Sequence, residues 1–163
     1  MSQLSYFVKT KTKIVIGSDH GGLLLKNYII QNLSDTYILE DIGVYTSAHC
    51  DYPDIAKRLC VEILKEEKDI IKVGILICGT GIGMSMSANR IKGIRCALCT
   101  NTYMAKMSRQ HNNSNVLALG ERVIGVELAL DIVKIFLEEF YEEKDRHNKR
   151  INKIELKEND LKC

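Results

Sequence analysis

One short stretch of the chain, CGTGIGMS from Cys78 to Ser85, places a thiol directly before three glycines at alternate positions. Glycines allow backbone N–H groups to converge on a bound oxygen, and a following helix N-terminus adds positive partial charge. A thiol in that setting is favoured as its thiolate, which acts as a base or a nucleophile. The alternative is a small core residue that ends a strand, the commoner fate of a free cysteine. The spacing alone leaves both interpretations open.

The loop does not match the two best-known nucleotide-binding motifs. A dinucleotide fingerprint needs glycine at position 84, where Met84 stands, and a P-loop needs Gly-Lys-Ser/Thr. The glycines therefore indicate an anion site of another kind.

Other polar residues follow the remaining predicted strands. Asp19-His20 follows the first strand, Tyr52 the second and Arg122 the fifth, while His111-Asn112 follows the helix after the fourth. Each has an ordinary explanation taken singly; Asp19, for example, is a suitable helix cap. Ligands of open parallel sheets bind beyond the carboxyl ends of the strands. We therefore expect these residues to share one location with the glycine loop.

These loops need a scaffold, and short apolar runs alternate with longer amphipathic ones along the chain. This alternation implies right-handed crossovers and a parallel sheet covered on both faces. It predicts a Rossmann-like, three-layer αβα sandwich with a five-stranded parallel sheet. The expected strands are 13–17, 37–42, 73–78, 94–99 and 116–119, and the expected helices are 20–33, one opened by Pro53, 81–89, 101–110 and 126–141.

The segment beyond Glu142 is highly charged, with Ile151, Ile154 and Leu161 as its main apolar residues. We expect a final C-terminal helix there. Its apolar face is too thin for a core of its own, which favours packing on a partner subunit.

Composition narrows the class of protein. The chain has 163 residues, 45% of them hydrophobic, which suits one compact domain. Its 23 Lys and Arg nearly balance 21 Asp and Glu, so no nucleic-acid or membrane partner is expected. Neither a signal peptide nor an apolar membrane span is recognisable, and six scattered cysteines are expected to be reduced. These features predict a cytoplasmic protein.

Cys96-x-x-Cys99, together with His49, Cys50 and His111, offers donor types that suit a zinc site. Cys96 and Cys99 lie in a predicted strand, where this spacing sends the two side chains to opposite faces. No second C-x-x-C is present. We therefore expect no metal site.

Several further motifs occur in a fixed order between about positions 13 and 151. Together they are far more specific than the glycine loop alone. In chain order they are Ile16-Gly-Ser-Asp-His-Gly-Gly22, Asp51-Tyr-Pro53, Gly74-Ile-Leu-Ile-Cys-Gly-Thr-Gly-Ile-Gly83, Ala88-Asn89, Gly93-Ile-Arg95, Ser108-Arg-Gln-His-Asn112, Asn115-Val-Leu-Ala118, Gly120-Glu-Arg-Val-Ile-Gly125 and Arg146-His-Asn-Lys-Arg150.

In these motifs the chain resembles the ribose-5-phosphate isomerase B type of sugar-phosphate isomerases, which includes galactose-6-phosphate isomerase subunits. The resemblance implies an isomerase domain over 13–151, preceded by an N-terminal extension, 1–12, and followed by a polar tail, 152–163. It implies interconversion of ribose 5-phosphate and ribulose 5-phosphate through an enediolate, in the pentose phosphate pathway of carbohydrate metabolism. Neither metal nor organic cofactor is implied. A homodimer with the site at the subunit interface is expected.

The same resemblance assigns roles to residues. It makes Cys78 the base; some members carry a glutamate four residues further on, where this chain has Ile82. It makes His111 the ring-opening group, with Asp19 and Thr80 as helpers. The substrate-binding residues that it implies are Asp19, His20, Tyr52, Gly79, Thr80, Gly81, Ile82, Gly83, Asn112, Arg122, Arg146 and Arg150.

Two alternatives stay open from the sequence. Isomerisation of a six-carbon sugar phosphate, such as allose 6-phosphate or galactose 6-phosphate, fits the same motifs. A non-catalytic sugar-phosphate sensor is the second, although pure binding needs no base such as Cys78.

Overall fold

The computed structural model describes residues 11–154 of the chain. A five-stranded sheet, in the order β2-β1-β3-β5-β4 and parallel throughout, forms its centre. The strands are β1 (Lys11–Ser18), β2 (Ile38–Asp41), β3 (Ile70–Cys78), β4 (Cys96–Leu98) and β5 (Val116–Gly120).

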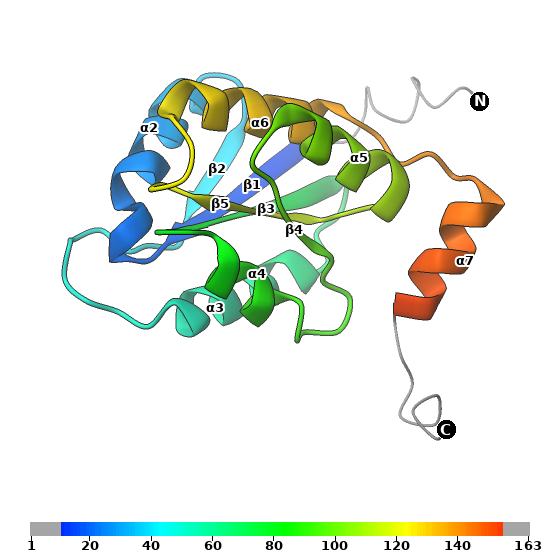
Figure 1. Cartoon of the computed structure of the whole chain (residues 1–163), viewed down its shortest axis with the longest axis horizontal. Helices are drawn as coiled ribbons and strands as arrows, with labels where there is room; N and C mark the ends of the chain where they lie inside the picture. Colours follow the sequence, from blue (N-terminus) through cyan, green and yellow to red (C-terminus); the bar gives the residue numbers. More distant parts are fainter. Residues whose placement is uncertain (1–10, 155–163) are drawn as a thin grey trace.

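Helices cover both faces of this sheet (Figure 1). α3 and α4 pack on one face, and α2, α5 and α6 pack on the other. The predicted three-layer αβα sandwich is therefore confirmed. The helical elements are η1 (His20–Gly22), α2 (Leu23–Leu33), α3 (Tyr52–Leu64), α4 (Ile82–Ala88), α5 (Thr102–Asn112), α6 (Val126–Glu138) and α7 (Asp145–Ile154).

The two core clusters follow from the alternation of side chains along each strand. In β3, Ile75 and Ile77 belong to the cluster under α2, α5 and α6. Their neighbours Leu76 and Cys78 belong to the cluster under α3 and α4. Cys78 therefore ends a central strand on the face from which α4 departs.

Every predicted strand and helix is present, with shifted boundaries. β1 begins at Lys11, inside the expected extension, because it pairs with β3 from Lys11↔Ile70 onward. α7 continues to Ile154, past the expected domain end at 151. The expected apolar residue Leu161 lies outside the described residues.

α7 lies beside the three layers and not within them (Figure 1). His147 is its one buried residue within the described chain, and Ile154 is 56% exposed. None of the helices within 11–154 has the length and apolar content needed to cross a membrane.

A fully buried lysine ties α2 to the segment after β2. The Lys26 ammonium contacts both carboxylate oxygens of Asp41, at 2.7 and 2.6 Å, and donates to the Val44 carbonyl at 2.8 Å. It also lies 4.9 Å from the centre of the Tyr45 ring. The charge is thus neutralised and hydrogen-bonded, as a buried ammonium must be. This contact holds the chain that leads towards Tyr52.

Replacing Lys26 by methionine leaves the partly buried Asp41 carboxylate without its counter-ion. We expect Lys26→Met to lower the free energy of unfolding by about 3 kcal/mol, measured by urea denaturation. Lys57→Met, at an exposed position of α3, is the control. Equal stability of the two variants would contradict the role given to Lys26.

Candidate active site

The carboxyl ends of β1, β3 and β5 bring three of the predicted segments into contact. The Asp19 N–H donates to the Ile77 carbonyl at 3.1 Å, and the Glu121 N–H donates to the Cys78 carbonyl at 3.0 Å. Asp19 is buried, and its Oδ1 accepts from the Gly21 N–H at 2.8 Å. Asp19 and Glu121, far apart in the chain, therefore belong to one compact set of loops around Cys78.

The glycine loop folds back on its own thiol. Gly81 has a left-handed backbone, φ +77°, and precedes α4. A Cβ at Gly81 would lie 2.5 Å from Leu98 Cδ1 and 2.9 Å from the Leu119 carbonyl carbon, so glycine is needed both for its conformation and for space. In this turn the Gly81 N–H donates to Cys78 Sγ at 3.0 Å. The sulfur is therefore the acceptor of a backbone donor from its own loop.

Arg122 packs against the glycine loop with both its backbone and its side chain. The Arg122 backbone N–H donates to the Gly79 carbonyl at 3.0 Å. A Cβ built on Gly79 would be 3.5 Å from its Nε and Cζ, and one built on Gly21 would be 3.5 Å from its Nη2. The guanidinium thus spans the loops after β1 and β3, and it supplies fixed positive charge beside Cys78.

Tyr52 and His20 border the same region. The Tyr52 ring lies so close to the backbone of Gly83 that a Cβ there would be 2.7 Å from the ring. The His20 ring meets the His49 ring edge-on, with 4.3 Å between centroids. His20 Nδ1 is buried and makes no hydrogen bond. His49 was not predicted for the site. The only sequence signal for it is its position, three residues before Tyr52.

Glu121 is a second residue that the sequence did not identify. Its Oε2 accepts a hydrogen bond from the Leu25 N–H at 2.8 Å, in the first turn of α2. A carboxylate at that position satisfies a free N–H group and complements the positive end of the helix. The contact fixes the turn from which Arg122 extends.

The expectation that His111 and Asn112 share this edge is wrong within one chain. Both lie in the last turn of α5, which has run back towards the amino ends of the strands. The Asn112 carbonyl accepts from Arg95 Nε at 3.2 Å, just before β4 begins. The chain then enters β5 beside Gly74, whose N–H donates to the Asn115 carbonyl at 2.9 Å. A helix that follows a parallel strand necessarily ends at the opposite edge of the sheet.

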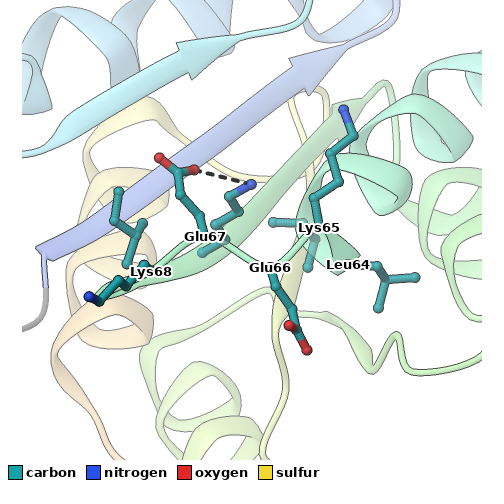
Figure 2. A pocket seen from close by; sticks show the side chains of 8 residues that line it. Leu64, Lys65, Glu66, Glu67 and Lys68 are labelled. Atoms are coloured by element: carbon teal, nitrogen blue, oxygen red, sulfur yellow. Dashed lines mark ion pairs between the residues drawn. The ribbon is translucent and has the colours of Figure 1, made fainter.

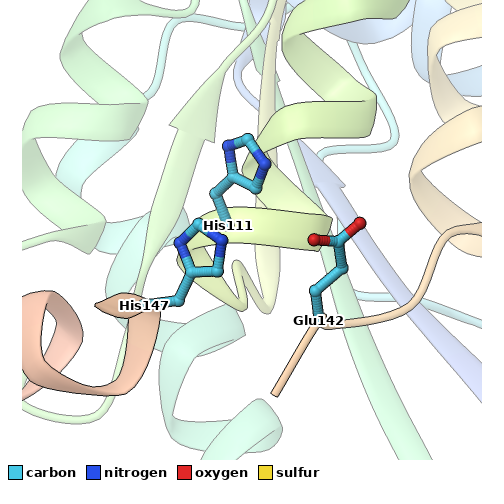
Figure 3. Close-up of side chains that lie close together, drawn as sticks. All are labelled: His111, Glu142 and His147. Carbon is cyan, nitrogen blue, oxygen red and sulfur yellow. The ribbon is translucent and has the colours of Figure 1, made fainter. Parts of the chain in front are cut away.

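Arg146 and Arg150 lie with His111, because α7 packs against α5. The His147 ring, between the two arginines in sequence, stacks on the His111 ring with 4.5 Å between centroids. Arg146 Nε donates to His147 Nε2 at 3.2 Å. Figure 3 shows His111 and His147 together with Glu142, from the segment before α7. The predicted site residues therefore form two groups at opposite edges of one subunit.

A hollow near the end of α3 is separate from both groups (Figure 2). It is lined by the turn into β3, where the Glu67 carboxylate is 3.3 Å from the Lys72 ammonium. This is again the amino edge of the sheet, away from Cys78. A second hollow runs along Arg95, Asn112 and Asn152, between α7 and the amino ends of β4 and β5.

The predicted separation of Cys96 and Cys99 is confirmed. Cys99 lies in the core cluster under α2, α5 and α6, and Cys96 packs on the opposite cluster. Burial raises the pKa of Cys96, and it raises the pKa of Cys99 and of Cys60 to about 11. Protonated, separated thiols are poor metal ligands.

Known proteins share this fold and these motifs. The sequence model of the Ribose/Galactose Isomerase family matches residues 14–154. Ribose-5-phosphate isomerase B of Escherichia coli is 43% identical over 143 residues, which cover 87% of this chain and 93% of the relative. The D-erythrulose-4-phosphate isomerase of Pectobacterium atrosepticum is 42% identical over 131 residues, 79% of this chain and 84% of that protein.

A solved structure agrees with the sequence relatives. Ribose-5-phosphate isomerase B of Clostridium thermocellum superposes with a TM-score of 0.82 at 48% identity, over 87% of this chain and 94% of that one. Fold and motifs together define a sugar-phosphate isomerase. The chain belongs to the Ribose/Galactose Isomerase family.

The thiols of Cys60 and Cys99, which are buried, and of Cys96, which is partly buried, are expected to resist alkylation in the folded protein. At pH 7 a thiol with a pKa of about 11 is ionised in roughly one molecule in ten thousand. Iodoacetamide should therefore modify Cys60, Cys96 and Cys99 slowly in native protein and rapidly in urea, as followed by mass spectrometry. Equal rates in the two conditions would contradict their burial.

Proposed function

We propose that this chain is an aldose–ketose isomerase that interconverts ribose 5-phosphate and ribulose 5-phosphate. The observation that carries the proposal is the Cys78 loop: a thiol 3.0 Å from the Gly81 N–H, beside the guanidinium of Arg122, in a chain of this family. A pure phosphate-binding protein has no use for a base at that point.

The reaction moves one proton between neighbouring carbons. The Cys78 thiolate removes the proton from C2 of the open-chain aldose, and the C2–H electron pair forms the enediolate double bond. The thiol then returns this proton to C1, while the proton of the C2 hydroxyl passes to the C1 oxygen and C2 becomes the carbonyl. No electron acceptor or cofactor is required, because one carbon is oxidised as its neighbour is reduced.

The enediolate places negative charge on the oxygens of C1 and C2. Backbone N–H groups of residues 79–83 are the donors for that charge in this proposal. Such preorganised donors often provide the largest share of a rate enhancement. Tyr52 and His20 border the sugar, and Arg122 contributes positive charge near its oxygens and phosphate.

The substrate exists mostly as a closed furanose, so a second acid–base group must open the ring. His111 suits this step, because an imidazole is a common general acid and base; it donates a proton to the ring oxygen, and the carboxylate of Asp19, the predicted helper, accepts the proton of the C1 hydroxyl. Gly74, paired beside the residues that follow α5, lies four residues before Cys78, roughly 13 Å along a strand. His111 of the same chain is therefore at the wrong edge.

A homodimer resolves this separation. In the proposed assembly, one subunit supplies Cys78, its glycine loop and Arg122, and the other supplies His111 and Asn112. Arg146 and Arg150 come with His111 because α7 packs on α5, and they bind the phosphate from the partner side. The exposed α7, with little apolar surface on its own subunit, is consistent with a place between subunits. We also propose a cytoplasmic location, where the free thiols stay reduced.

The length of the sugar is a separate question. A relative at 42% identity is a D-erythrulose-4-phosphate isomerase, which makes a four-carbon substrate the second candidate. Rates of turnover for four-, five- and six-carbon sugar phosphates, measured on the same preparation, distinguish the candidates. The highest kcat/KM on ribose 5-phosphate is the expected result, and a preference for another length would replace that substrate in the proposal.

The base is tested by Cys78→Ala in an isomerisation assay with ribose 5-phosphate and a chelator. We expect kcat to fall at least ~100-fold with a small change in KM, as when a general base is removed. Cys50→Ala, which removes a partly buried thiol outside the loop, should retain activity. Retained kcat in Cys78→Ala would rule out this thiol as the base.

The shared site is tested by mixing two inactive variants. Cys78→Ala and His111→Gln, unfolded together and refolded, form mixed dimers in which one of the two sites has both groups intact. We expect about a quarter of the parental activity to return, although neither variant alone is active. Mixtures that stay inactive, despite mixed dimers detected by native mass spectrometry, would show that each site is built by one chain.

A further inference from the structure

One side-chain cluster contains the proposed ring-opening group, His111, together with two residues, Glu142 and His147, that have no role in the proposed reaction. His111, Glu142 and His147 each offer one ligand atom, and these atoms lie within 4.8 Å of one another (Figure 3). Within residues 11–154 it is the one group of three or more such side chains that is close enough to hold a metal ion. Two imidazoles and a carboxylate are a donor set that zinc accepts, with a water completing the tetrahedron.

The cluster is built on a fixed frame. The Glu142 N–H donates to the Gln110 carbonyl at 3.0 Å, next to His111, and the His147 N–H donates to the Lys144 carbonyl at 2.8 Å. The stacked imidazoles come from the last turn of α5 and the first turn of α7. The frame therefore sets the three residues side by side before any ion arrives.

The ligand atoms need a small further approach. A tetrahedral zinc ion with bonds near 2.1 Å requires neighbouring ligand atoms about 3.4 Å apart. Glu142 lies in the segment between α6 and α7 and is partly exposed, so rotation of its side chain can close the gap. His147, by contrast, is 2% exposed and stays in place.

Positive side chains oppose an ion at this place. Arg146 Nε donates to His147 Nε2, and Lys144 competes for Glu142. Both competing side chains are exposed, and the Lys144–Glu142 ion pair is of the exposed kind that contributes little. An ion that takes His147 Nε2 must displace Arg146, which makes binding weaker than in a closed structural site and readily reversible. Imidazole ligands select zinc-like ions over magnesium and calcium.

We propose that His111, Glu142 and His147 bind a divalent transition-metal ion of the zinc type, and that the bound ion inhibits the enzyme. The ion occupies His111, which then cannot move the proton for ring opening, and it releases Arg146 from His147. The metal is thus an inhibitor and takes no part in the chemistry. The inhibitory part rests on the proposed function; the binding part does not.

Binding is measured on the whole protein by titration with Zn²⁺, and with Co²⁺ as a spectroscopic probe. We expect one ion per chain and a cobalt spectrum of nitrogen and oxygen ligands. Glu142→Gln and His147→Gln should each weaken binding about tenfold or more. The matched control Glu143→Gln, an exposed carboxylate one residue away, should bind as the parent does. Arg146→Met should bind more tightly, because it removes the competing donor.

Two outcomes overturn the site. Equal affinity for Zn²⁺ in the parent, Glu142→Gln and Glu143→Gln would place the ion elsewhere. Glu142→Gln keeps the buried His147, so this comparison can be made even if His147→Gln does not fold. A cobalt–thiolate absorption band places the ion on a cysteine. Inhibition is tested separately: Zn²⁺ should slow isomerisation, EDTA should restore it, and Glu142→Gln should be less sensitive. Zinc bound at the cluster of an active enzyme without inhibition would overturn the inhibitory part, and an inactive protein that binds zinc there would count against the proposed function only.

Discussion

The hydrogen bond from the Gly81 N–H to Cys78 Sγ is the contact on which the candidate site depends. It exists because Gly81 adopts a left-handed turn in a space that admits no side chain. The turn brings backbone donors to the sulfur at the end of a central strand. The neighbouring loops from β1 and β5 are hydrogen-bonded to this same strand end, so the sheet positions Asp19 and Arg122. The contact of Glu121 with the first turn of α2 supports the turn that carries Arg122.

The parallel sheet also places the two acid–base groups of the proposed reaction, Cys78 and His111, at opposite edges of one subunit. Each crossover helix returns the chain to the amino edge, so a residue in the last turn of α5 cannot face a loop at the carboxyl edge of its own sheet. His111 and the arginines of α7 are therefore grouped together, away from Cys78. The proposed dimer brings the base of one subunit to the acid of the other, and makes assembly a condition of activity.

Much of this arrangement could be predicted from the sequence because its signals are local. Alternating apolar runs gave the five strands, and the glycines after Cys78 marked the loop. The face of the sheet on which a strand residue lies follows from its position in the strand alone. The spacing of Cys96 and Cys99 therefore correctly predicted that their side chains lie on opposite faces. Contacts made through space were missed. A lysine in a helix predicts a solvent-exposed charge, yet Lys26 is fully buried on Asp41. Glu121 capping α2 and Glu142 beside His147 likewise depend on segments that only folding brings together.

The packing of Arg122 explains the absence of a side chain at two glycines whose backbone conformation does not require glycine. Gly21 and Gly79 are not among the residues with positive φ, so their dihedral angles suit any amino acid. At Gly79 a methyl group would be in van der Waals contact with the guanidinium at 3.5 Å, while a longer side chain would displace the guanidinium. The absence of a side chain at Gly79 therefore leaves room for the Arg122 guanidinium to pack on the backbone. A side chain at position 79 would therefore alter the electrostatics of the site by moving the charge of Arg122.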